Sequence, residues 1–287
     1  MTITSCILIF SALALFGARL SVAQQDSTKA EQTPSGWHVL DTKGKDPASQ
    51  LTCNVHYGDE QYTWVVSSSG EDVTLSHPSS ARVADSTKRI VSMHGLSGLA
   101  SELEVDGGKL IGLDGGEFGG GLWFSPSNSS EQVQLLSHAD VRAIIAVPKG
   151  TLILTGSRSL VSDIATVYLA TGGSSQKWTL NPIVNLGATP LLTIRNGSHS
   201  SFIITSRNLI RLDDDGQLKL LGTLPAELHP NSVAIDGKSN IYIGMTFTVF
   251  RFRRTEDGYI PEALVPNSCN LHQYVAEDTF LHCGCAQ

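Results

Sequence analysis

One pattern constrains the fold of this chain more than any other: a short strand-forming run, a turn, and a second strand-forming run recur along most of its length. The clearest copy is "HPNSVAIDGKSNIYIG", residues 229 to 244. The last β-branched residue before each turn marks a copy, and successive marks are 39, 42, 47, 41 and 40 residues apart. The marks are Val66, Val105, Val147, Ile194, Ile235 and Val275. A period of roughly 40 to 45 residues with several short strands per unit is typical of a β-propeller, in which each unit forms one blade.

The unit around Ile235 contains four strand-forming runs: "SVAID", "IYIGM", "TVFRFRR" and "YIPEALV". In the third run Phe250 and Phe252 alternate with Arg251 and Arg253, which is the period of two of a half-buried strand. Convincing amphipathic helices are scarce elsewhere. We therefore expect an all-β fold, a six-bladed β-propeller formed as a single domain by residues 37–287.

The last unit, around Val275, contains only two strand-forming runs. We expect the N-terminal runs "WHVLD" and "QLTCNVHY" to supply its other two strands. Joining the first and last strands in one blade closes the ring and removes an exposed sheet edge.

The N-terminus resembles a secretory signal. An apolar run from about Cys6 to Phe16 is followed by small residues and by Ser21-Val22-Ala23. This predicts a signal peptide over residues 1–23, although no basic residue precedes the apolar run. The alternative is an uncleaved anchor, but the run is well short of the ~20 residues that span a bilayer as a helix. We expect a secreted or periplasmic monomer, without a membrane span after cleavage, whose polar residues 24–36 form a disordered leader.

The charge of the mature chain argues against nucleic-acid binding. Cleavage removes Arg19 and no acid, which leaves 19 basic and 27 acidic residues and a net charge of -8. Nucleic-acid affinity comes largely from Lys and Arg that neutralise phosphates. We expect the partner to be a protein or a small-molecule ligand.

Four cysteines remain after cleavage: Cys53, Cys269, Cys283 and Cys285. An even number in an exported protein favours disulfides, with three connectivities open. A bond from Cys53 to the C-terminal group would close the ring and stabilise it by about 4 to 5 kcal/mol through loop entropy. The alternative is a zinc site formed by the C-terminal cysteines with His272 and His282.

The stretch from 229 to 244 resembles NHL-type repeats and the related strand pair of gluconolactonase-like calcium-dependent propellers. The resemblance covers about 25 residues and implies a propeller more than an activity. In the gluconolactonase-like family the Asn of a Pro-Asn-Gly element contributes to a metal site at the channel mouth, which carries over only to Asn231. Ser232 stands where that family has Gly, and its early Glu-Gly-Pro element has no counterpart here, since Glu102 is followed by Leu103 and Glu104.

Two further groups could hold a ligand or a metal. Histidines lie in or near the segments that enter the first strands, but at uneven offsets, and the simpler interpretation is solvated loop histidines. Asp114 and Glu117 lie in the Gly-rich stretch "GLDGGEFGGGLWFSP", where they could bind calcium. The favoured interpretation is structural: the glycines allow a tight loop or bulge, and Trp123 and Phe124 pack between blades. The histidines are His56, His94, His138, His229 and His272.

No catalytic motif is evident, since a Gly-x-Ser-x-Gly element, a dinucleotide fingerprint and a Walker motif are all missing. Asn128-Ser129-Ser130 and Asn196-Gly197-Ser198 are glycosylation sequons, which are relevant only if the source is a eukaryote. We expect a ligand-binding or protein-interaction module without a cofactor. The alternative is a calcium-dependent lactonase or esterase-like hydrolase with its site at the channel mouth, and a purely structural envelope protein is a third option.

Overall fold

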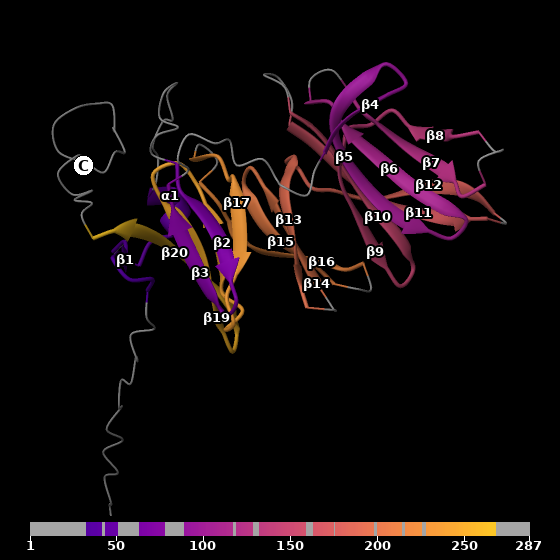
Figure 1. The fold of residues 1–287 in the computed structure, drawn as a ribbon. Coiled ribbons are helices and arrows are strands. Elements are labelled where there is room, and N and C mark those ends of the chain that lie inside the picture. The colour runs from indigo at the N-terminus through magenta and orange to yellow at the C-terminus, as the bar shows by residue number, and fades with distance from the viewer. Residues whose placement is uncertain are drawn as a thin grey trace, which may run out of the picture. The chain divides into compact units, whose positions relative to one another are not determined.

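The computed structural model describes eleven segments of the chain, and Figure 1 shows the strands that they form. The described residues are 33–41, 44–50, 63–77, 89–116, 119–128, 132–158, 163–174, 176–197, 200–213, 216–225 and 228–267.

The fold is all-β, as the sequence predicted. The described residues form antiparallel sheets and one short helix of four residues, α1 (Pro47–Gln50). Among these residues no helix has the length and apolar character needed to cross a membrane.

The first two sheets come from the N-terminal half. The hairpin consists of β2 (Val65–Ser69) and β3 (Asp72–Ser76). The next sheet has the order β4-β5-β6-β7-β8. Its strands are β4 (Arg89–Met93), β5 (Leu96–Val105), β6 (Gly108–Asp114), β7 (Gly121–Pro126) and β8 (Gln134–Ser137).

Two four-stranded sheets follow, each with its strands in chain order. Their strands are β9 (Val141–Val147), β10 (Gly150–Arg158), β11 (Asp163–Gly173), β12 (Gln176–Asn185), β13 (Pro190–Asn196), β14 (Ser200–Thr205), β15 (Asn208–Asp213) and β16 (Leu218–Thr223).

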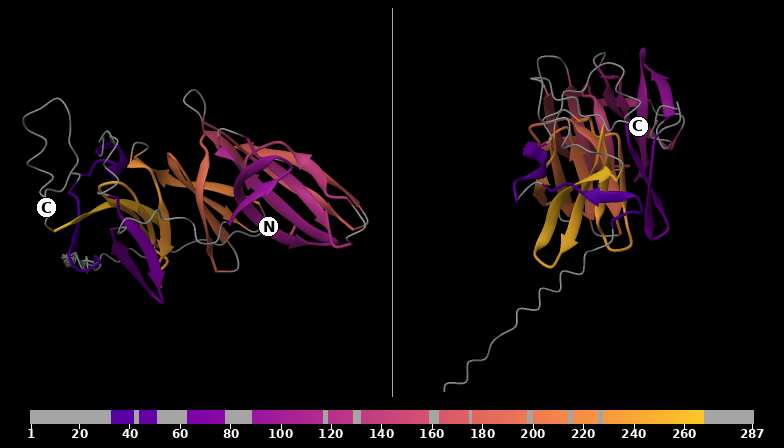
Figure 2. Two further views of the ribbon diagram at one scale, coloured as in Figure 1. Left: turned by 45° about the horizontal axis from the view of Figure 1, so that its top comes forward. Right: turned by 90° about the vertical axis from the view of Figure 1, so that its left-hand side faces the viewer.

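The last sheet contains strands from both ends of the described chain, in the order β1-β20-β19-β18-β17. Its strands are β1 (Trp37–Val39), β17 (Ser232–Ile235), β18 (Ile241–Gly244), β19 (Val249–Thr255) and β20 (Gly258–Pro266). All five sheets can be followed from two other directions in Figure 2.

Five of the six predicted strand-turn-strand units are confirmed. Val105 ends β5, Val147 ends β9 and Ile235 ends β17, each just before a turn into the next strand. Val66 lies within β2, and Ile194 lies near the end of β13. The sixth mark, Val275, lies outside the described residues.

The N-terminal strand joins a C-terminal sheet, but one unit earlier than we predicted. β1 pairs antiparallel with β20, the fourth strand of the fifth unit, with Trp37 opposite Pro266. The sequence predicts that residues 33 to 36 belong to the disordered leader, but two of them form hydrogen bonds beside this sheet. Thr33 Oγ1 donates to the Trp37 carbonyl, and the Asn267 amide donates to the Gly36 carbonyl. The second N-terminal run, "QLTCNVHY", lies almost wholly outside the described residues.

Each central sheet buries both of its faces. Because successive side chains of a strand point to opposite faces, neighbouring residues belong to different core clusters. On β18, Ile241 and Ile243 pack against the sheet that starts with β13, whereas Tyr242 packs with Val66 of the β2–β3 hairpin. On β10, Leu152 and Ile153 likewise belong to different clusters. This period of two therefore reflects contact with two neighbouring sheets instead of one core face and one solvent face.

The four clusters define an order of packing. The β2–β3 hairpin packs on the sheet of β17 to β20, that sheet on β13 to β16, that on β9 to β12, and that on β4 to β8. We call the strand that carries the marked residue the first strand of its unit. These first strands contact one another in the order β2, β17, β13, β9 and β5. The described residues contain five sheets and show no closed ring, so the six blades stay a prediction.

Each sheet has two ends. The leading end is the one at which the first strand begins, and the trailing end is the opposite one. Because the strands are antiparallel, the leading end also contains the last residue of each second strand and the first residue of each third strand.

Candidate functional site

Polar residues gather at the leading end, at one repeated position. Asp140, Thr189 and Asn231 each directly precede a first strand, β9, β13 and β17 respectively. Asp140 and Thr189 are buried, and Asn231 is half-buried. Buried polar groups normally have hydrogen-bond partners, so the partners of each one decide whether it is structural or available to a ligand.

Asp140 belongs to a charged cluster that joins two sheets. Arg142 Nη1 lies 2.5 Å from Asp114 Oδ2, and Arg142 Nε donates to the Gly156 carbonyl at 2.9 Å. Asp140 Oδ1 accepts from the Gly115 amide at 3.3 Å. The cluster therefore fixes the end of β6 to the start of β9.

Burial raises the pKa of the Asp140 carboxyl above its ordinary value of 3.8, and the nearby Asp114 carboxylate adds to the rise. The Gly115 amide and Arg142 act in the opposite direction. The native state therefore holds the Asp140 proton more tightly than the unfolded chain does, and this group favours folding most at low pH.

We expect Asp140→Asn to remove a pH-dependent penalty. In the native protein the contribution of Asp140 to the free energy of unfolding is fully present below pH 3.8 and is lost as the pH rises through its higher native pKa. The difference in unfolding free energy, native protein minus variant, should therefore fall as the pH rises above 3.8. Urea denaturation across that range measures it, and a difference that stays constant or rises would contradict the assignment.

Asp163, at the start of β11, joins the next pair of sheets. Its Oδ1 accepts from the Thr189 amide at 2.5 Å, and its Oδ2 accepts from Ser206 Oγ at 2.8 Å. The Thr189 hydroxyl itself is different. Thr189 is fully buried, yet its Oγ1 has no hydrogen-bond partner among the described residues.

Asn231 repeats this arrangement before β17. Its carbonyl oxygen Oδ1 accepts from Ser232 Oγ at 2.8 Å, and the same hydroxyl oxygen accepts from the Val66 amide of β2 at 2.9 Å. The amide nitrogen Nδ2 of Asn231 is buried without a partner among the described residues. Two adjacent first strands, β13 and β17, thus each begin after a side chain with an unused buried polar atom.

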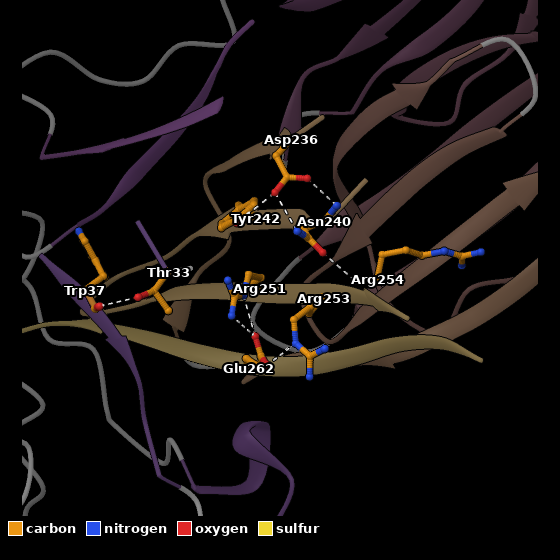
Figure 3. Close-up of polar contacts among 9 residues, drawn as sticks. All are labelled: Thr33, Trp37, Asp236, Asn240, Tyr242, Arg251, Arg253, Arg254 and Glu262. Carbon is orange, nitrogen blue, oxygen red and sulfur yellow. Dashed lines mark hydrogen bonds and ion pairs between the residues drawn. The ribbon is translucent and has the colours of Figure 1, made fainter. Parts of the chain in front are cut away.

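A second polar network crosses the sheet of β17 to β20 on the face that packs against the β2–β3 hairpin (Figure 3). Arg251 is 1% exposed, and its Nη2 lies 2.5 Å from Glu262 Oε2. Arg253 Nε contacts the other oxygen, Oε1, at 2.8 Å. Burial raises the pKa of Tyr242, the residue opposite Arg251 on β18.

The same network continues to the trailing end of the sheet. Asp236 Oδ2 accepts from Asn240 Nδ2 at 2.8 Å and from the Tyr242 hydroxyl at 3.2 Å (Figure 3). Asn240 Oδ1 accepts from the Arg254 amide at 2.7 Å. Almost every group here is paired within the chain, so we interpret this network as a structural support of the sheet.

Three of the five predicted histidines, His94, His138 and His229, lie at the leading end. His94 is in the turn before β5 and stacks on Trp123 with 5.9 Å between ring centroids. His138 precedes β9, and His229 precedes β17; all three are exposed. His56 and His272 lie outside the described residues. Within those residues no group of three or more His, Cys, Asp or Glu side chains is arranged for a metal ion.

The Gly-rich stretch is partly explained by packing. Phe124 packs against Trp178 of the next sheet, with ring centroids 5.4 Å apart, as predicted for a residue between blades. Asp114 is paired with Arg142, and Gly116 donates to its second oxygen at 3.1 Å. Glu117 lies outside the described residues, as do Cys53, Cys269, Cys283 and Cys285, so the calcium pair and the disulfides stay predictions.

Sequence reasoning identified Asn231 but missed the residues that share its position. Asp140 and Thr189 differ from it in type and in distance from the turn, because the first strands differ in length. Their common feature is the place directly before a first strand. Aligning the units on that start, instead of on the turn, would have found all three.

The chain was compared with known proteins. No protein-family model matches it, and no curated protein matches it significantly.

Proposed function

We propose that this chain is an exported β-propeller whose leading end binds a neutral polar ligand. The ligand is a small molecule or a segment of another protein. Three observations support the proposal: the recurring strand-turn-strand units, the face-to-face packing of successive sheets, and the place of β1 in the C-terminal sheet. Loops and strand ends on a rigid scaffold are where binding residues concentrate.

The unused buried atoms of Thr189 and Asn231 carry the binding proposal. An unpaired buried polar group costs about 1 to 3 kcal/mol, and a chain without a use for it would gain stability by replacing it with an apolar group. A hydroxyl donates or accepts, and an amide NH2 donates. Both can therefore bind ligand oxygens, such as hydroxyl or carbonyl groups, without needing a charged ligand.

We expect Thr189→Val to keep or raise the stability of the protein while abolishing binding, since valine replaces the unpaired hydroxyl with a methyl group of similar size. The measurement is the thermal shift with a panel of neutral mono- and disaccharides and uncharged blocked dipeptides. A probe that binds the native state raises its melting temperature by mass action. That rise should be present in the native protein and lost in Thr189→Val and Asn231→Leu.

Thr193→Val is the matched control, because Thr193 lies on β13, the strand that Thr189 directly precedes, and its side chain is exposed. It should keep the thermal shift. The proposal is overturned if no probe of the panel shifts the native protein. It is also overturned if Thr189→Val lowers the unfolding free energy by more than about 1 kcal/mol, the usual value of a formed hydrogen bond.

The calcium-dependent hydrolase remains the alternative, but no contact among the described residues favours it. Of its candidate ligands, Asp114 is already paired with Arg142. Asn231 belongs to another sheet, and the sheets of β9 to β12 and β13 to β16 pack in succession between the two. Calcium is included as a probe in the same thermal-shift experiment. A rise with calcium that EDTA reverses and that Asn231→Leu abolishes would favour the hydrolase over the binding module.

A further inference from the structure

The two sequons of the chain fall at equivalent places in the fold. Asn128 follows the end of β7, and Asn196 is the last residue of β13. The third strand of a sheet ends where its first strand ends, because both run in the same direction between antiparallel neighbours. Both acceptor residues therefore lie at the trailing end, opposite Asp140, Thr189 and Asn231.

The surroundings of both residues suit attachment of a bulky group. Asn128 is exposed, two residues beyond the strand that ends at Pro126. Asn196 is half-buried at the start of the turn between β13 and β14. The next residue, Gly197, has a φ of 61°, and a Cβ built on it would meet no atom within 4 Å. The turn at the second residue of this sequon is therefore uncrowded.

We propose that Asn128 and Asn196 are N-glycosylated during export. The co-reactant is an oligosaccharide linked to a lipid through pyrophosphate. The Asn Nδ2 forms a bond to C1 of the first sugar while the bond from C1 to the pyrophosphate oxygen breaks. The pyrophosphate-linked lipid leaves with that bond's electron pair, and a proton is lost from the amide nitrogen. Electrons balance without an oxidant, and the product is a bulky, solubilising surface group at each position.

The placement separates modification from the proposed binding face. An N-glycan at Asn231 would cover the leading end, whereas glycans at the trailing end leave it clear. The inference rests on export of the chain, which is part of the proposed function, but not on what the leading end binds. Glycosylation and ligand binding can therefore fail independently.

Peptide mass spectrometry of the protein secreted by its own source tests the inference. Treatment with an amidase that hydrolyses the glycosyl-asparagine bond should convert Asn128 and Asn196 to aspartate and lower the intact mass. Asn128→Gln and Asn196→Gln should each remove one glycan, as should Ser130→Ala and Ser198→Ala, which leave the acceptor in place. Asn181 is exposed but is followed by Pro182 and Ile183 and so is not in a sequon; it is the control and should remain asparagine.

An intact mass equal to that of the bare mature chain, unchanged by the amidase, would overturn the proposal. Modification of one Asn alone upholds it at that position and overturns it at the other. A loss of secretion in Asn128→Gln with normal secretion in Ser130→Ala would show a structural role of the Asn side chain and count against the glycan at that site.

Discussion

Glu262→Gln lowers the free energy of unfolding by about 3 to 5 kcal/mol, the usual cost of removing one partner of a buried ion pair. Arg251 is almost completely buried, and its Nη1 already has no partner among the described residues. Glutamine keeps the shape of the side chain but removes the charge that offsets the guanidinium. Arg253, which contacts the other oxygen of Glu262, loses the same anion. Chemical denaturation monitored by Trp fluorescence measures the change.

Glu104→Gln is the control for this prediction. Glu104 pairs with Lys109 at 3.2 Å, but its side chain is 76% exposed. An exposed pair contributes about 0 to 1 kcal/mol, so the control should lie within that range. Replacing both Arg251 and Glu262 with methionine should cost less than Glu262→Gln alone, because it leaves no unpaired buried charge at Arg251. If Glu262→Gln costs no more than Glu104→Gln, the network in Figure 3 is not a support of the sheet.

Phe252→Ala should destabilise the protein by about 3 to 5 kcal/mol through lost burial and the cavity that remains. The Phe252 ring is fully buried between the sheets of β13 to β16 and β17 to β20. It lies directly against Gly222 of β16, where an added Cβ would come within 2.6 Å of the ring. The midpoint of urea unfolding measures the loss, at an unchanged dependence on urea concentration.

Ile260→Ala on the adjacent β20 serves as the comparison, since Ile260 is 44% exposed. Surface substitutions usually stay within about 0.5 kcal/mol. Equal losses from Phe252→Ala and Ile260→Ala would show that these two sheets do not pack as described.

The sequence predicted strands and turns well because both depend on local chemistry. The unit that contains Ile235 folds into four strands over the predicted runs, and Phe250 and Phe252 share one face. The sequence could not show which element packs on the opposite face of this sheet. Alternation with Arg251 is typical of a strand with one solvated side, yet Arg251 is buried under a hairpin whose residues lie more than 170 positions earlier.

The candidate site was harder to predict for the same reason. Asn231 was identified by resemblance, whereas Thr189 resembles any threonine in a loop. Its unusual property is a buried hydroxyl that has no partner among the described residues, and the burial depends on the packing of sheets distant in the sequence. Arg142 was missed because its partner Asp114 is 28 residues away in another sheet. Long-range pairing of this kind leaves no local signal.

The pairing of β1 with β20 sets the time at which the protein can fold. His38 and Asn267, which are hydrogen-bonded at 3.1 Å beside this pair, are separated by 229 positions. At a synthesis rate of about 5 to 20 residues per second, the ribosome makes the partner of β1 roughly 10 to 45 seconds after β1 itself. During that interval β1 has no strand of its sheet to pair with, and an unpaired strand invites aggregation. Conditions that slow elongation or delay release of the chain should therefore reduce the yield of folded protein more than conditions that weaken its final stability.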